Sequence, residues 1–326
     1  IGRKKLLILT STLMVAEMAV WDFAPRGNPT LLFWLLALNR ILSGLGEAAA
    51  RQPGGRFDLL LDLQVYLKAG LITALTPATV KLGFDRKRTR DLNSLFTTHR
   101  IPPLPVGSAH IQDQYFEFLR VVGVDPEPLE FGLDLSETER ENREAFRTEL
   151  GRPYCAMVVS SSDRRKNWNP EGYARVAAGI RSDFGLEPIL VGGHSRREEE
   201  MTRAILDRPG PGVTDARGGG LRRLLGLLDG AELVVSPDTG PLHMARAMKT
   251  PVVGLFGFTN PKRSGPYRHF PELVVDGYAR IPGEEYPVST ERRPGGMGRI
   301  TPAMVMEKVE QALLDGRAGG LGGTEG

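Results

Sequence analysis

The sequence predicts an α/β protein whose parallel sheets are divided between two domains. The chain has 326 residues, which corresponds to two domains of ~150 residues each. From residue 153 onward, short apolar runs alternate with segments of helical periodicity. Apolar runs joined by helices are typical of a parallel sheet covered by helices on both faces. Hydrophobic residues make up 41% and charged residues 25% of the chain, which excludes a disordered or collagen-like protein.

The first domain is predicted to comprise residues 1–150. An apolar stretch at 31–45 is interrupted by Asn39 and Arg40 and indicates an amphipathic helix. The further elements expected in this domain are strands at 57–63 and 81–84 and helices ending at 74 and covering 110–124 and 134–149. The last helix has Ser136 as its expected N-cap and Glu139 three residues later. We expect it to close the first domain or to begin a linker.

The second domain is predicted to comprise residues 151–315. Its expected strands lie at 154–160, 188–192, 213–215, 231–236 and 251–256. Its expected helices lie at 170–184, 197–206, 221–228, 242–248 and 300–314. We expect the last of these helices to pack back on the first domain. The glycine-rich segment 316–326 is predicted to be a disordered tail.

Charge, cysteine content and hydropathy exclude several classes of protein. There are 42 Lys and Arg against 39 Asp and Glu, so the net charge of 42 − 39 = +3 does not suggest a nucleic-acid-binding protein. The single cysteine, Cys155, excludes a disulfide framework and a thiolate zinc cluster, and we expect it to pack inertly in a buried strand of a protein from a reducing compartment. No apolar run reaches the ~20 residues that span a bilayer. The five histidines are scattered without metal-ligand spacing, so no metal site is predicted.

Four loops follow the predicted strands of the second domain, and all are rich in glycine, hydroxyls or cations. They cover residues 160–168, 192–200, 237–243 and 257–267. Ligands of open parallel α/β sheets bind beyond the carboxyl ends of the strands. The sequence therefore predicts that the ligand site lies on this rim.

The loop 237–243, with the sequence PDTGPLH, is the most informative of the four. Asp238 or Thr239 can cap the following helix, and Gly240 permits a tight turn into it. The amides at such a helix start, together with the helix dipole, form a site for an anion. His243 lies one turn further on and faces either the ligand or the sheet. The alternative is that Asp238 is only a cap and His243 only a core residue.

The other loops offer similar alternatives. Lys166 ends a basic cluster that either contacts a phosphate or is simply solvated. The glutamates at 198–200 either suit the dipole of a first helical turn or supply a carboxylate for the two hydroxyls of a ribose. Thr259 either belongs to a turn or adds a hydroxyl to the same anion site.

Residues 234–261, VVSPDTGPLHMARAMKTPVVGLFGFTNP, resemble the long motif of glycosyltransferase family 9, the ADP-heptose:lipopolysaccharide heptosyltransferases. Segments 161–176, 56–71 and 297–314 also resemble parts of that family. The resemblance covers roughly residues 56–314. It implies a GT-B fold, in which two Rossmann-like lobes face a central cleft, with the donor on the C-terminal lobe and the acceptor on the N-terminal lobe. It further implies metal-independent transfer with inversion at the sugar.

Carried onto this chain, the resemblance implies roles for individual residues. Lys166, Asp238 and His243 are the implied catalytic residues. The implied donor-binding residues are these three together with Ser161, Ser162, Glu198, Thr239, Gly240 and Thr259. Weaker matches imply that Asp62, Gln64 and Lys68 lie on the acceptor side. No cofactor is implied, because ADP-heptose or another nucleotide sugar is a substrate.

The chain departs from the family pattern near its start. The family opens with a strand and a glycine-aspartate motif that supplies the catalytic base, whereas residues 4–29 resemble the family's second strand and helix. Either the first β-α unit lies upstream of Ile1, which is not a methionine, or the protein is a non-catalytic binding or scaffold relative. An epimerase or hydrolase of the same fold is disfavoured by loops 161–168 and 237–243.

The implied acceptor is a lipid-linked acidic oligosaccharide. The basic segments 85–90 and 164–166 suit such an acceptor or an anionic membrane surface, although they are equally compatible with a solvated face. We therefore expect a cytoplasmic protein at the inner face of the inner membrane.

Overall fold

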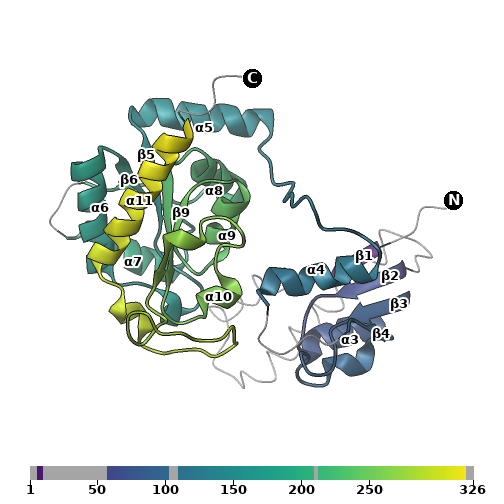
Figure 1. The fold of residues 1–326 in the computed structure, drawn as a ribbon. Helices are drawn as coiled ribbons and strands as arrows, with labels where there is room; N and C mark the ends of the chain where they lie inside the picture. The colour runs from purple at the N-terminus through teal and green to yellow at the C-terminus, as the bar shows by residue number, and fades with distance from the viewer. Residues whose placement is uncertain (1–5, 10–56, 103–108, 209–211, 321–326) are drawn as a thin grey trace, which may run out of the picture. The chain divides into compact units, whose positions relative to one another are not determined.

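The computed structural model describes residues 6–9, 57–102, 109–208 and 212–320 (Figure 1). The chain divides into two compact units. The first unit comprises Ile1–Val106 and Asp113–Pro126, and the second comprises Gly107–Gln112 and Glu127–Gly326. The amphipathic helix predicted at 31–45 lies outside the described residues.

The first unit contains a parallel sheet of strand order β1-β2-β3-β4. The strands are β1 (Leu6–Leu9), β2 (Phe57–Asp62), β3 (Ala78–Gly83) and β4 (His99–Arg100). Helix α3 (Leu67–Leu75) joins β2 to β3, and helix α4 (Ile111–Val121) supplies Phe118, which packs edge-to-face on Phe84 at a centroid distance of 4.9 Å. The strands and helices predicted between residues 57 and 124 are therefore confirmed. Strand β3 begins three residues earlier than predicted because Ala78 pairs with Phe57.

The second unit contains a parallel sheet of strand order β10-β9-β8-β5-β6-β7. Its strands are β5 (Tyr154–Val158), β6 (Glu187–Val191), β7 (Thr214–Asp215), β8 (Leu233–Pro237), β9 (Val252–Phe256) and β10 (Val274–Asp276). The chain runs outward from β5 to β7 and then returns to β8 beside β5. The order therefore reverses between β5 and β8, and such a reversal creates a crevice for ligands.

Helices cover both faces of this sheet (Figure 1). They are α5 (Glu137–Leu150), α6 (Pro170–Phe184), α7 (Arg196–Leu206), α8 (Gly220–Asp229), α9 (Gly240–Ala247) and α11 (Pro302–Gly320), while the short helix α10 (Pro261–Ser264) contributes no buried residue. Cys155 and Met157 contribute to one apolar core, whereas Tyr154, Ala156 and Val158 contribute to the other. This alternation follows from the two-residue period of a strand. The prediction of a parallel sheet covered on both faces is confirmed, and Cys155 is buried as expected.

The division between the units differs from the predicted boundary at residue 150. Helix α5 has the predicted capping box of Ser136 and Glu139, but it packs on α8 of the second unit. Arg143 forms an ion pair with Asp229, and Phe146 packs edge-to-face on Tyr154. The sequence could not show this because the helix has no fully buried residue and its exposed pattern is compatible with either domain.

The end of the chain also differs from prediction. Helix α11 places Val305, Val309 and Ala312 in the core of the second unit, against α6, whereas its predicted packing on the first domain stays a prediction. The helix continues to Gly320, so residues 316–320 are helical and not part of a disordered tail. Residues 321–326 lie outside the described part of the chain.

Candidate functional site

The site is centred on Lys166 and Asp238, which follow the two strands that flank the switch point. Lys166 ends a short 3₁₀ helix (η2, Arg164–Lys166) after β5, and Asp238 directly follows β8. The Lys166 Nζ lies 2.9 Å from Asp238 Oδ2 and also donates to the Asp238 carbonyl at 3.3 Å. Two residues 72 positions apart are thus joined at the crevice that the strand order creates.

The loop after β5 is fixed by its own side chains. Asn167 accepts a hydrogen bond from the Ser161 amide at 2.7 Å and donates to Ser160 Oγ at 3.0 Å. Trp168 is buried, and its indole donates to the Ile300 carbonyl at 3.0 Å. A Cβ on Gly172 would lie 2.4 Å from the Trp168 ring, so only glycine fits beneath it. These contacts hold the loop in place and thereby position Lys166.

Asp238 is a buried carboxylate, only 6% exposed, with partners from two loops and from helix α9. Its Oδ2 accepts from Thr259 Oγ1 at 2.6 Å in addition to Lys166, and the His243 Nε2 lies 3.9 Å from Oδ1. Burial by itself raises the pKa of this carboxyl, but His243, Lys166 and Thr259 together lower it well below its usual range. Asp238 is therefore ionised at neutral pH and holds Lys166, Thr259 and His243 around one point.

Helix α9 begins beside this cluster without a side-chain cap. Thr239 occupies the N-cap position, but its side chain makes no capping hydrogen bond, and the Asp238 carboxylate is engaged by Lys166 and Thr259. Thr239 is therefore the N-cap residue, in line with one of the two predicted alternatives, but neither Thr239 nor Asp238 caps the helix with its side chain. Gly240 is exposed at the first helical position, and His243 is half-buried one turn later. The start of the helix is left open to an anion.

Glu198 lies at the start of α7 and organises the loop after β6. Its carboxylate accepts from the amides of Gly193 at 2.6 Å and Ser195 at 3.0 Å, and from Ser195 Oγ at 2.6 Å. These bonds form a capping box with Ser195. The carboxylate thus faces its own loop, and the structure does not join it to the Lys166–Asp238 pair.

The two predicted serines after β5 differ in exposure. Ser161 is buried, and its hydroxyl accepts from the Asp163 amide at 3.4 Å. Ser162 is exposed, and its carbonyl accepts a hydrogen bond from Arg197 of α7. The loops after β5 and β6 are therefore tied together through Ser162.

The three residues predicted on the acceptor side lie in the first unit: Asp62 ends β2, Gln64 follows it and Lys68 lies on α3. Asp62 is fully buried and accepts from Thr73 Oγ1 at 2.9 Å, from Asn93 Nδ2 at 3.1 Å and from the Gln64 amide at 3.1 Å. Burial raises the pKa of Asp62 by more than these hydrogen bonds lower it. Gln64 is half-buried and Lys68 is exposed. Asp62 is thus directed inward, where it ties β2 to α3.

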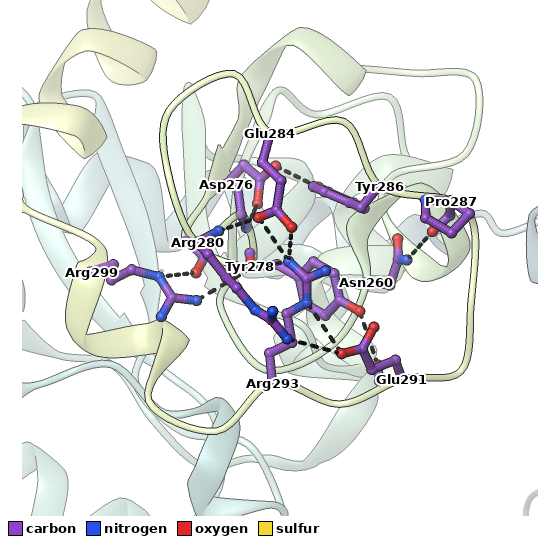
Figure 2. A network of polar contacts seen from close by, with 12 residues as sticks. Asn260, Asp276, Tyr278, Arg280, Glu284, Tyr286, Pro287, Glu291, Arg293 and Arg299 are labelled. Atoms are coloured by element: carbon purple, nitrogen blue, oxygen red, sulfur yellow. Dashed lines mark hydrogen bonds and ion pairs between the residues drawn. The ribbon is translucent and has the colours of Figure 1, made fainter.

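Sequence analysis missed the segment that follows β10. Residues 277–299 form a loop whose polar network is shown in Figure 2, and Thr259 pairs with Arg292 of this loop in an antiparallel bridge. The signals that could have found it are the arginine pair 292–293 and the glycine pair 295–296. Neither has a recognisable partner in the sequence, because Thr259 lies 33 positions away.

Two further findings concern the described residues alone. They contain no group of three or more His, Cys, Asp or Glu side chains arranged to hold a metal ion. None of their helices is both long enough and apolar enough to cross a membrane.

Comparison with solved structures shows the fold class. The fold is that of the GT-B glycosyltransferases. A glycosyltransferase family 9 structure from Veillonella parvula DSM 2008 superposes with a TM-score of 0.68 at 22% identity, covering 84% of this chain and 78% of that one. The structure of E. coli heptosyltransferase WaaC with ADP gives 0.60 at 20% identity, covering 90% and 82%. The predicted fold class is confirmed.

The sequence assigns the chain within that class. The model of glycosyltransferase family 9 (heptosyltransferase) matches residues 49–282, and the chain belongs to this family. It is 31% identical over 221 residues to the lipopolysaccharide core heptosyltransferase OpsX of Haemophilus influenzae, covering 67% of this chain and 62% of OpsX. It is 27% identical to lipopolysaccharide heptosyltransferase 1 of Pseudomonas aeruginosa, covering 65% and 57%. The matched segment thus spans about three fifths of these relatives, and the predicted family is confirmed.

Proposed function

We propose that the protein transfers a heptose from ADP-heptose to a lipopolysaccharide core acceptor, with inversion at the sugar and without a metal. The names of the relatives support the reaction class, and the WaaC complex with ADP supports the donor. The observation that carries the proposal is the Lys166–Asp238 ion pair of 2.9 Å at the switch point. It sets a cation beside an uncapped helix start, where a diphosphate can bind.

In the proposed reaction, the acceptor hydroxyl attacks the anomeric carbon while the bond from that carbon to the diphosphate breaks. Negative charge grows on the departing diphosphate, and the Lys166 ammonium and the amides at the start of α9 stabilise it. Asp238 holds Lys166 and Thr259 in place and leaves its second oxygen near His243. The hydroxyl must also lose a proton to a base, which we assign to none of the described residues.

The donor and acceptor sites draw on different units. We assign the diphosphate and heptose to Lys166, Asp238, Thr239, Gly240 and His243, with Ser161, Ser162 and Thr259 beside them and Glu198 toward the ribose. All of these residues belong to the second unit. The proposed acceptor-side residues Asp62, Gln64 and Lys68 belong to the first unit.

An acidic, lipid-linked acceptor suits part of the basic segment 85–90. Arg88 is not available to it, because its guanidinium bonds Glu117 at 2.8 Å and Asp85 and is largely buried. Arg86, Lys87 and Arg90 are exposed, and the Arg90 amide donates to the Val65 carbonyl at 2.7 Å. The backbone of Arg90 therefore contacts the loop after β2. We propose that these three cations attract the acceptor's negative charges, and that the protein works at an anionic membrane surface facing the cytoplasm.

The test is heptose transfer from ADP-heptose to heptose-free lipopolysaccharide by the full-length protein. Lys166→Met and Asp238→Asn should each reduce kcat/KM by about 100-fold or more, because charge stabilisation of the leaving group is lost. Lys308→Met is the matched control, since Lys308 lies on α11 and contacts Gln311. Transfer at wild-type rates by the Lys166 variant would disprove the proposed site. Tight ADP binding without any transfer by the wild-type protein would instead favour a binding protein.

A further inference from the structure

The loop 277–299 is held together by a network of polar and cation–π contacts. Figure 2 shows Arg293 at its centre, between Tyr278 and Tyr286. The guanidinium lies 4.3 Å from the Tyr278 ring centroid and donates to both oxygens of Glu284 at 3.0 Å. Arg299 donates to the Gly277 carbonyl at 3.0 Å. Arg293 is thus bonded within the loop through its Nη1, whereas its buried Nε makes no hydrogen bond, and the residue is 9% exposed.

Backbone contacts fix this loop against the loop that follows β9. The Arg293 amide donates to the Phe258 carbonyl at 3.0 Å, next to the bridge between Thr259 and Arg292. A Cβ on Gly296 would lie 1.7 Å from the Gly257 carbonyl oxygen, so the two backbones approach as closely as glycine allows. The register of the two loops is therefore set, and Arg292 lies beside Thr259, whose hydroxyl bonds Asp238.

The Arg292 side chain makes fewer and longer contacts than that of Arg293. Its guanidinium lies 5.6 Å from the Phe258 ring centroid, and its Nη1 is 3.8 Å from Asp163 Oδ2. That distance is too long for a hydrogen bond. The same carboxylate already accepts two bonds from Arg165, at 2.9 and 2.8 Å, and Arg165 lies over the same Phe258 ring. The Arg292 side chain is 54% exposed.

The local charges leave a surplus of positive charge. Among the residues that the structure describes, the ion pairs of Arg165, Lys166 and Arg292 are made with Asp163 and Asp238 alone, and the Lys166 amide donates to the Asp163 carbonyl at 2.9 Å. The half-exposed Arg292 guanidinium has N–H donors that are not used within the described part of the protein, and Lys166 is already paired with Asp238. The planar guanidinium can form two parallel hydrogen bonds to a phosphate, so Arg292 is suited to bind one.

We propose that Arg292 is a second cationic residue that binds the diphosphate of the nucleotide donor, held beside Lys166 by the loop 277–299. This inference rests on the proposed function, because it takes the Lys166–Asp238 cluster as the diphosphate site. Arg293 is a positioning residue that acts through the loop. Arg292 supplies the contact itself.

The experiment is calorimetric titration of the full-length protein with ADP and with AMP. Arg292→Met should weaken ADP binding by about tenfold to a hundredfold, as expected for the loss of hydrogen bonds to a charged group. AMP binding should change much less, because AMP lacks the second phosphate. Arg280→Met is the matched control, since Arg280 lies in the same loop, is 67% exposed and pairs with Glu291. It should bind both nucleotides like the wild type.

Further outcomes separate this inference from the proposed function. Wild-type ADP affinity in Arg292→Met, or an equal loss for ADP and AMP, overturns the assignment of Arg292. If Lys166→Met loses ADP binding in the same series, the proposed donor site stands even when the Arg292 assignment fails. If Lys166→Met also binds ADP normally, the proposed site itself is wrong. Arg292→Lys should lie between wild type and Arg292→Met, because it keeps the charge but loses the fork.

Discussion

At the scale of single residues, Asp238 shows how a short motif acquires its chemistry from distant partners. The sequence PDTGPLH places the aspartate at the end of a strand, which suggests a helix cap. In the fold, the carboxylate instead receives Lys166 from one loop and Thr259 from another. A buried carboxylate needs such partners, because an unpaired charge away from water is costly. The partners also keep it ionised.

The prediction at the scale of residues concerns the stability of the folded protein in acid. The pKa of Asp238 in the folded state lies below the value of 3.8 expected in the unfolded chain. The stabilisation from its ionised form is therefore complete above that value and is lost as the pH falls through the folded pKa. Wild type should lose more stability than Asp238→Asn when the pH is lowered from about 5 to 3.

Chemical denaturation of both proteins across this pH range measures the difference. Asp58→Asn is a suitable control, because Asp58 is exposed on β2 of the first unit. Parallel acid profiles for wild type and Asp238→Asn would show that the carboxylate is not stabilised as the structure indicates.

At the scale of elements, the close approach of the loops after β9 and β10 decides where Thr259 and Arg292 lie. Gly257 and Gly296 allow the two backbones to touch, and Asn260 adds a bond from its side chain to the Pro287 carbonyl at 2.8 Å (Figure 2). The bridge between Thr259 and Arg292 depends on this contact. The position of the loop 277–299 is thus set by backbone and side-chain contacts with the loop after β9.

The prediction at this scale is a glycine substitution. Gly296→Ala should lower the melting temperature and weaken ADP binding, because the new methyl group would collide with the Gly257 carbonyl and displace the loop. Gly298→Ala is the matched control in the same 3₁₀ helix, η4 (Gly296–Arg299), since a Cβ there meets nothing within 4 Å. Differential scanning fluorimetry with and without ADP reports both effects. Equal behaviour of the two variants would argue against the close approach.

At the scale of the whole molecule, the second unit contains every residue assigned to the donor. Helix α5 belongs to this unit, because Phe146 and Leu150 pack on its core and Arg222 pairs with Glu139. The segment before α5 also packs on the second unit, since the Phe131 ring centroid lies 4.1 Å from the guanidinium carbon of the buried Arg246 on α9. The folding unit therefore begins well before the sequence boundary at residue 150.

The corresponding prediction compares two fragments. Residues 127–320 should unfold cooperatively and bind ADP without transferring sugar, because the acceptor-side residues are absent. Residues 151–320 should melt at a lower temperature, since removal of α5 exposes apolar side chains such as Leu224 and Leu228. Circular dichroism melts and ADP titration of both fragments test this. Equal stability of the two fragments would place the boundary at 150 after all.

How much could be read from the sequence depends on the range of the interactions involved. The four long strands of the second unit, β5, β6, β8 and β9, were predictable because a buried strand is a short apolar run. The capping box of α5 was predictable because its residues are three positions apart. Strand β10 was not, because its three residues lie within an irregular segment. Family motifs located Lys166 and Asp238, but not the contact between them.

The sequence by itself determined the fold class, the alternation of strands and helices, the family and the loops that carry the site, because these depend on local periodicity and on contiguous motifs. Only the tertiary structure decided that Asp238 pairs with Lys166 and Thr259 rather than capping α9, that α5 joins the second unit, and that Arg292 lies beside the site. Each of these depends on residues far apart in the chain. Their meeting is set by the order of the strands and by backbone contacts that no local pattern encodes.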